Sequence, residues 1–133
     1  MRPARFQDYL LDLANKQPHT TARPLTEAGE TRYPYGAAIR TPRGEARWQI
    51  IGQLAPGERH NTPDTPVHAK PPALVDDPGP DASPEAWLAA LIAQAGCTEY
   101  EQIERWSTRP DGAGQAGITI HCHNGARLYI RAL

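Results

Sequence analysis

The sequence predicts an α+β fold in which two helices pack on one face of a mainly antiparallel sheet. Two segments have the apolar spacing of helices, and two others alternate apolar and polar residues around turn signals, as hairpins do. A proline-rich segment, residues 55–84, separates the two halves. The sheet is therefore expected to combine an N-terminal hairpin with a C-terminal three-stranded meander, joined by this long segment.

The first helix is predicted from about Pro3 to Asn15. Pro3 suits the first turn of a helix, and Pro18 stops its continuation. One apolar stripe recurs at the i, i+3, i+4, i+7 spacing and consists of Phe6, Tyr9, Leu10 and Leu13. Residues 17–34 show no periodicity and are expected to form a loop. Residues 36–54 follow as a hairpin candidate, with Pro-Arg-Gly as the turn signal.

The segment 55–84 contains eight of the 14 prolines. It could be a flexible linker between two small domains, or an extended strap across a single domain. Each flank has only about 50 residues, too few for a comfortable core of its own. An extended strap within a single domain of residues 1–133 is therefore favoured. Because a structureless segment of this length is unusual in a compact domain, part of it is expected to be mobile. Its expected anchors are Val67, Leu74 and Val75.

The second helix is predicted over residues 83–96. Ser83 is the expected N-cap, Pro84 takes the first helical position, and Gly96 ends the helix. The apolar positions of this helix are Trp87, Leu88, Leu91, Ile92 and Ala95. Residues 102–109 are predicted as a strand that pairs with the hairpin after them, and residues 110–116 as a loop.

The last hairpin reads GITIHCHNGARLYI, residues 117–130. A two-residue Asn-Gly turn would place Leu128 and Ile130 on the opposite face from Ile118 and Ile120, because side chains alternate along a strand. A three-residue loop over 123–125, with Gly125 in the left-handed position, restores one apolar face.

In that register, Cys122 points into the core, His121 points outward, and His123 belongs to the turn. We expect the first hairpin to follow the same arrangement, so that Arg40 opposes Arg47 as His121 opposes Arg127. Opposed like charges are mildly destabilising and call for neutralisation. Either a nearby carboxylate such as Glu45 or Glu104, or a bound anion or acidic partner, would supply it.

The overall composition excludes several classes of protein. The chain has 133 residues, a net charge of −1 and a pI near 6.5, which argues against a dedicated nucleic-acid binder. No run of 18 apolar residues predicts a membrane span. Asp8 and Asp12 interrupt the N-terminal apolar stretch, so no signal peptide is predicted and the cytoplasm is the expected location. Cys97 and Cys122 are then expected to be free thiols.

No catalytic or cofactor motif stands out. His121 and His123 could share a metal, but zinc needs three or four ligands, and neither C-x-x-C nor H-E-x-x-H is present. No cofactor and no metal are predicted. Trp48, Trp87 and Trp106 each fit an inward pattern and are expected in the core.

The leading hypothesis is a non-enzymatic binding or accessory module that uses a basic and aromatic sheet face toward a protein or another anionic partner. The residues proposed for this face are Arg40, Arg47, His121, Arg127, Tyr129 and Arg131. A small enzyme or metal-binding protein with a site around His121 and His123 is the alternative, and nucleic-acid binding through the basic N-terminal region is a weaker one. A homodimer would be compatible with the alanine-rich second helix but is not required by it.

Overall fold

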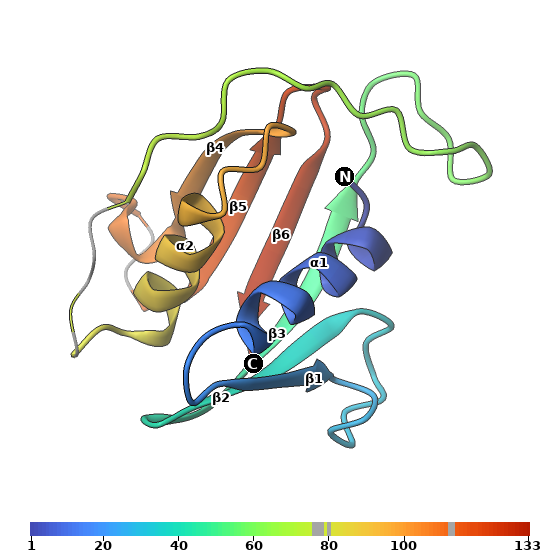
Figure 1. The fold of residues 1–133 in the computed structure, drawn as a ribbon. Coiled ribbons are helices and arrows are strands. Elements are labelled where there is room, and N and C mark those ends of the chain that lie inside the picture. Colours follow the sequence, from blue (N-terminus) through green and yellow to red (C-terminus); the bar gives the residue numbers. More distant parts are fainter. Residues whose placement is uncertain (76–78, 80, 112–113) are drawn as a thin grey trace.

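The computed structural model describes residues 1–75, 79, 81–111 and 114–133 (Figure 1). Within them, six strands form one antiparallel sheet in the order β1-β2-β3-β6-β5-β4. The strands are β1 (Thr21–Pro24), β2 (Gly36–Thr41), β3 (Gly44–Gln53), β4 (Tyr100–Arg105), β5 (Gly117–Cys122) and β6 (Arg127–Ala132). Helices α1 (Pro3–Asn15) and α2 (Pro84–Gln94) pack on one face of this sheet (Figure 1). The predicted α+β class, with its hairpin and its meander, is confirmed.

The two helices begin at the predicted residues. In α1, Pro3 occupies the first turn, and its ring lies so close to β3 that a Cβ at Gly52 would overlap it. In α2, the Ser83 hydroxyl accepts a hydrogen bond from the Ala86 backbone N–H at 3.1 Å, and Gly96 follows the helix with a φ of +65°. Ala95, which was expected to face the core, is exposed because it lies beyond the last helical turn.

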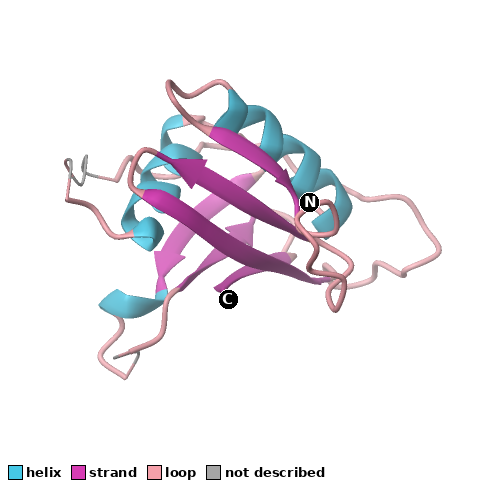
Figure 2. Cartoon of the chain, turned by 90° about the horizontal axis from the view of Figure 1, so that it is seen from below, coloured by secondary structure: helices cyan, strands magenta, loops and turns pink. Residues whose placement is uncertain are grey.

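The core lies between the helices and the sheet and includes side chains from both halves of the chain. Its largest buried members are Trp48, Tyr100, Phe6, Leu10, Ile39, Leu88, Ile92, Ile118, Ile120, Leu128 and Ile130. The halves also join through the sheet, because β3 pairs with β6 and Ile50 stands opposite Ile130. Figure 2 shows how strongly the sheet twists between the first three strands and the other three.

The prediction of a continuous loop over residues 17–34 was wrong, because Thr21–Pro24 forms the edge strand β1 beside β2. Four residues are too few to display a period of two, and a proline is tolerated in a strand only at such an edge. Residue Leu25, directly after β1, is buried against Gly36 of β2. Gly36 and the core residue Ala37 are consecutive in β2, so they face opposite sides of the sheet. The loop after β1 therefore folds over the face opposite the helices.

The strand predicted over residues 102–109 is shorter and starts earlier. It ends at Arg105, and a single 3-10 turn, η1 (Trp106–Thr108), follows. This turn carries Trp106 to the sheet face opposite the helices, where its ring covers Gly117 and its indole N–H donates to Thr119 Oγ1 at 2.8 Å. Trp106 is therefore half-buried on that face and not in the core.

A buried carboxylate fixes this turn against α2. Glu85 accepts hydrogen bonds from Arg105 Nε at 2.9 Å, from the Gly117 backbone N–H at 3.0 Å, and from the hydroxyl of Ser107. Although burial raises the pKa of Glu85, these donors lower it below its usual value. The charge is thus fully compensated, and Glu85 joins α2 to both β4 and β5.

The register of the first hairpin differs from the predicted one. Pro42 and Arg43 form a two-residue turn without a bulge, so that Thr41 pairs with Gly44 and Arg40 stands opposite Glu45. The predicted pair of Arg40 and Arg47 does not form. The error is a slip of two residues, which leaves every side chain on the predicted face because side chains alternate with a period of two.

The described part of the segment 55–84 is held mainly by polar contacts. Arg2 donates to the carbonyls of Thr62 and Pro63, and Asn124 Nδ2 donates to the Thr65 carbonyl at 3.0 Å. Val67 and Leu74 are exposed, so their predicted role as anchors was wrong, whereas Val75 is half-buried. Residues 76–78 and 80 of the predicted strap, and 112–113 of the predicted loop, lie outside the described residues.

Neither α1 nor α2, nor any other helix among the described residues, has the length and apolar character needed to cross a membrane.

Candidate functional site

The candidate site is the sheet surface opposite α1 and α2, called here the outward face. In the second hairpin, Ile118 pairs with Ile130 and Ile120 with Leu128, which confirms the predicted register. Gly125 has a φ of +91°, as the three-residue loop requires. Because the isoleucines are buried, the residues between them point outward. These outward residues are Thr119 and the predicted His121, Arg127, Tyr129 and Arg131.

The three residues His121, Cys122 and His123 diverge instead of forming one site. Cys122 is buried, and burial raises the pKa of its thiol. His121 Nε2 lies 3.3 Å from Glu104 Oε1 on the outward face, whereas His123 Nε2 lies 2.8 Å from the carbonyl of Lys70. Among the residues the structure describes, no group of three or more His, Cys, Asp or Glu side chains could hold a metal ion.

At one end of the outward face, a single carboxylate lies within 4.0 Å of three arginine side chains. Glu45 Oε2 accepts a hydrogen bond from Arg47 Nε at 3.0 Å, and Glu45 Oε1 lies 3.7 Å from Arg40 and 4.0 Å from Arg23. These cations lower the pKa of Glu45, with the hydrogen bond from Arg47 as the largest cause. One negative charge against three positive ones leaves this end basic. Arg23 was missed because β1 was not predicted.

At the other end, the charges balance. Arg109 donates to both oxygens of Glu104, at 2.8 and 3.1 Å, and its guanidinium lies 5.7 Å from the ring centre of Trp106. These hydrogen bonds, and the one from His121, hold the pKa of Glu104 at about 2. Glu45 and Glu104 are the two carboxylates that the sequence suggested as neutralising groups. The sequence did not indicate that Arg109 and Trp106 lie on the outward face, because the turn η1 brings them there.

The centre of the outward face is apolar. Ile51 of β3 is 42% exposed and stands opposite Tyr129 of β6, whose hydroxyl donates to Gln53 Oε1 at 2.8 Å. The alternation of β3 places Ile51 on this face, so the sequence contained the signal for it. A large exposed aliphatic side chain beside an aromatic ring is typical of the middle of a protein contact surface.

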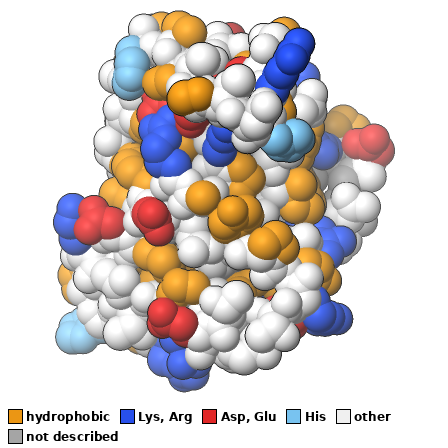
Figure 3. Space-filling view, turned by 90° about the vertical axis from the view of Figure 1, so that its right-hand side faces the viewer, with side chains coloured by type: hydrophobic (Ala, Val, Ile, Leu, Met, Phe, Trp, Pro, Cys, Tyr) orange, Lys and Arg blue, Asp and Glu red, His pale blue; other side chains and the backbone are white. Residues whose placement is uncertain are grey.

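Two arginines flank this apolar centre without a carboxylate partner. Neither Arg127 nor Arg131 has an acidic group within 4.0 Å among the described residues. The guanidinium of Arg131 lies 5.9 Å from the ring centre of Tyr33, which approaches from the loop after β1. The remaining surface is mixed, and the side shown in Figure 3 has charges of both signs scattered among hydrophobic side chains.

On the outward face, the histidine and both carboxylates are engaged within the chain: His121 contacts Glu104, Glu104 accepts from Arg109, and Glu45 accepts from Arg47. No protein family, curated protein or solved structure matches the chain.

Proposed function

We propose that the protein is a non-enzymatic binding module whose outward face holds an acidic region of another protein. The observation that carries the proposal is the exposed Ile51 beside the half-buried Tyr129, flanked by Arg127 and Arg131, which have no carboxylate partner among the described residues. An apolar and aromatic centre with arginine at its border is the composition of protein–protein contact surfaces.

The predicted residues contribute unequally to this proposal. Arg40 and Arg47 already share Glu45, and His121 already contacts Glu104, so their charges are partly used within the chain. Exposed ion pairs of this kind contribute little to affinity and serve orientation instead. Arg127 and Arg131 are therefore the expected contacts to the partner's carboxylates.

A protein partner is favoured over a nucleic acid. The chain as a whole has a net charge of −1, which gives no long-range attraction to a polyanion. An exposed isoleucine at the centre of the face has no counterpart in phosphate recognition, whereas it is suited to an apolar side chain of a protein. No observation favours a metal or catalytic site around His121 and His123, since they contact different partners.

Site-specific photo-crosslinking tests the proposal. A benzophenone amino acid replaces Ile51, and the captured protein is identified and then titrated against the wild-type chain and an Arg127→Ser/Arg131→Ser variant. We expect the variant to bind at least about tenfold more weakly, because each lost charged hydrogen bond removes about 1.5–3 kcal/mol. The matched control is Arg59→Ser, an exposed arginine in the segment 55–84, which should bind like the wild type. Equal affinity of the double variant and the wild type would refute the proposal.

A further inference from the structure

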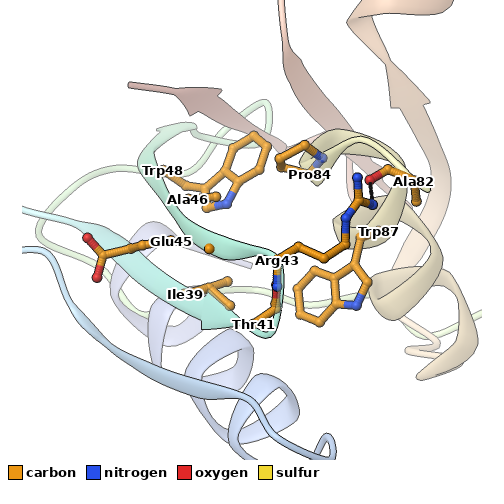
Figure 4. A pocket seen from close by; sticks show the side chains of 10 residues that line it. Ile39, Thr41, Arg43, Glu45, Ala46, Trp48, Ala82, Pro84 and Trp87 are labelled. Atoms are coloured by element: carbon orange, nitrogen blue, oxygen red, sulfur yellow. Dashed lines mark hydrogen bonds between the residues drawn. The ribbon is translucent and has the colours of Figure 1, made fainter. Parts of the chain in front are cut away.

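A pocket lies on the helical side of the sheet, between the turn of the β2–β3 hairpin and the start of α2 (Figure 4). Its volume is about 240 Å³. The residues that matter for its chemistry are Ile39, Arg43, Ala46, Trp48, Pro84 and Trp87. The pocket therefore lies on the other side of the sheet from Ile51 and Tyr129, and Glu45 of the outward face lies at its border.

Two indole rings form opposite walls of this pocket (Figure 4). Trp48 belongs to β3 and is almost fully buried, whereas Trp87 belongs to α2 and is half-buried. Ile39 and Ala46 close the floor with aliphatic carbon. Walls of this kind favour a flat apolar body, because an aromatic ring gains both area burial and ring–ring contact between two indoles.

The indole N–H of Trp48 has no hydrogen-bond acceptor among the described residues, and its nitrogen is not fully enclosed by protein atoms. A buried tryptophan usually finds an acceptor for this group. The half-buried Trp106 shows the ordinary case, since it donates to Thr119 Oγ1 at 2.8 Å. A donor is therefore available at an otherwise apolar wall.

Arg43 supplies positive charge in the same pocket. Its side chain crosses between the two tryptophans, and its guanidinium donates to the carbonyl of Ala82 (Figure 4). No carboxylate lies within 4.0 Å of it among the described residues. Glu45 also lines the pocket, but its carboxylate is turned away from Arg43 (Figure 4) and accepts a hydrogen bond from Arg47 Nε at 3.0 Å. Four N–H groups of the guanidinium remain available, and they suit a carboxylate.

We propose that this pocket binds a small aromatic carboxylate, with the ring against the indoles of Trp48 and Trp87 alongside the Arg43 side chain, and the carboxylate on the Arg43 guanidinium and the Trp48 N–H. The size agrees, because a closed cavity of about 150 Å³ holds one benzene ring, and the present space of about 240 Å³ admits a fused pair of rings. The proposal is independent of the outward face, so each of the two can fail without the other.

Titration with 1-naphthoate, followed by the three indole N–H signals in a nitrogen–proton correlation spectrum, tests the site. Trp→Phe variants assign the signals. We expect the Trp48 signal to shift strongly and the Trp87 signal to shift, while the Trp106 signal on the outward face stays in place. Absence of a Trp48 shift at millimolar naphthoate, or an equal shift of all three signals, would overturn the proposal.

Three comparisons separate the charge of the ligand from its ring. Arg43→Gln should weaken naphthoate binding by about tenfold, the effect of one charged hydrogen bond, whereas Arg127→Gln on the outward face should leave it unchanged. The neutral analogue 1-naphthalenemethanol should bind the wild type about as weakly as naphthoate binds Arg43→Gln. Equal affinity of the acid and the alcohol would contradict the role of Arg43.

A variant that fills the pocket distinguishes loss of the binding site from loss of the fold. Ala46→Phe should abolish naphthoate binding while an unmoved Trp106 signal reports an intact sheet. If Ala46→Phe still bound naphthoate with wild-type affinity, the ligand would lie elsewhere and the proposal would be wrong.

Discussion

Arg5 of α1 donates two hydrogen bonds to the carboxylate of Glu99, at 2.7 and 2.6 Å, and so ties the first helix to the turn before β4. The same guanidinium donates to Asp64 Oδ2 at 2.7 Å in the proline-rich segment. Glu99 is nearly enclosed, and the hydrogen bonds from Arg5 lower the pKa of its carboxyl below the usual range. Three segments far apart in the sequence therefore meet at the guanidinium of Arg5.

We expect Glu99→Gln to destabilise the protein by about 1.5–3 kcal/mol, the usual contribution of a hydrogen bond to a charged group. The amide keeps the shape of the side chain but offers an N–H where Arg5 needs an acceptor. Urea unfolding measures the change. Asp12→Asn is the control, because it removes a pair with Lys16 in which both side chains are exposed, and it should leave the unfolding midpoint unchanged. Equal midpoints for Glu99→Gln and the wild type would contradict this role.

Stability is expected to fall in acid. The folded state lowers the pKa of Glu99, and it holds the pKa values of Glu58 and Glu104 at about 2. For Glu58, burial acts in the opposite direction, but hydrogen bonds from Thr65 and Ala55 outweigh it.

An unfolded glutamate has a pKa of about 4.3, so the unfolded chain binds more protons than the folded one between about pH 4.3 and pH 2. The contribution of these carboxylates to the free energy of unfolding is therefore fully present above about pH 5, and it decreases as the pH falls toward 2. Urea midpoints at pH 7, 4.5 and 3 measure this decrease. Midpoints that stay constant down to pH 3 would show that these carboxylates are not stabilised in the folded state.

Local chemistry predicted a large part of this fold. Proline and serine at the starts of the helices, and the conflict between an Asn-Gly turn and the apolar alternation, located α1, α2 and the register of the last hairpin. Each is a signal within a few residues, and apart from Ala95 at the end of α2 they placed the apolar side chains on the correct faces. The outward positions of His121 and Arg127 followed from the same reasoning.

The wrong or missing predictions concern features that the alternation of apolar and polar residues along a strand does not determine. A slip of two residues in the first hairpin preserves both faces, so the pattern could not distinguish Arg47 from Glu45 as the partner of Arg40. Trp106 and Tyr33 reach the outward face through a 3-10 turn and a loop, and nothing local indicated either approach. The pocket beside Trp48 also depends on packing between distant elements.

The last hairpin provides a test of backbone strain. Gly125 and Gly57 both have positive φ, +91° and +84°, but only at Gly125 would a Cβ approach another residue, with Pro56 Cδ at 2.9 Å. Replacing Gly57 by alanine should cost about 1 kcal/mol through the backbone alone. Gly125→Ala should cost clearly more in urea unfolding, because Pro56 must also move. Equal costs would mean that this contact is unimportant.

A single unfolding transition is expected for the whole chain. The pairing of Ile50 with Ile130 joins the sheet of both halves, and neither half encloses the core alone. Far-ultraviolet circular dichroism and tryptophan fluorescence should therefore give coincident urea curves. Two separated transitions would show that the proline-rich segment links independent domains.

The charge on the outward face can be raised without touching an arginine. Glu45 is the only acidic group within 4.0 Å of Arg23, Arg40 and Arg47 among the described residues, so Glu45→Gln releases three guanidinium groups at once. Because attraction to a polyanion depends on unpaired cations, this variant should elute from heparin at a higher salt concentration than the wild type.

Asp12→Asn is the matched control for this elution experiment, because it changes the net charge equally on the exposed surface of α1, where Asp12 pairs with Lys16. If position matters, Glu45→Gln is retained longer than Asp12→Asn. If the two variants elute together, only net charge acts and the arginines near Glu45 form no anion-binding surface. That result would restrict the proposed contact to Arg127, Arg131 and the apolar centre, since their positions do not depend on Glu45.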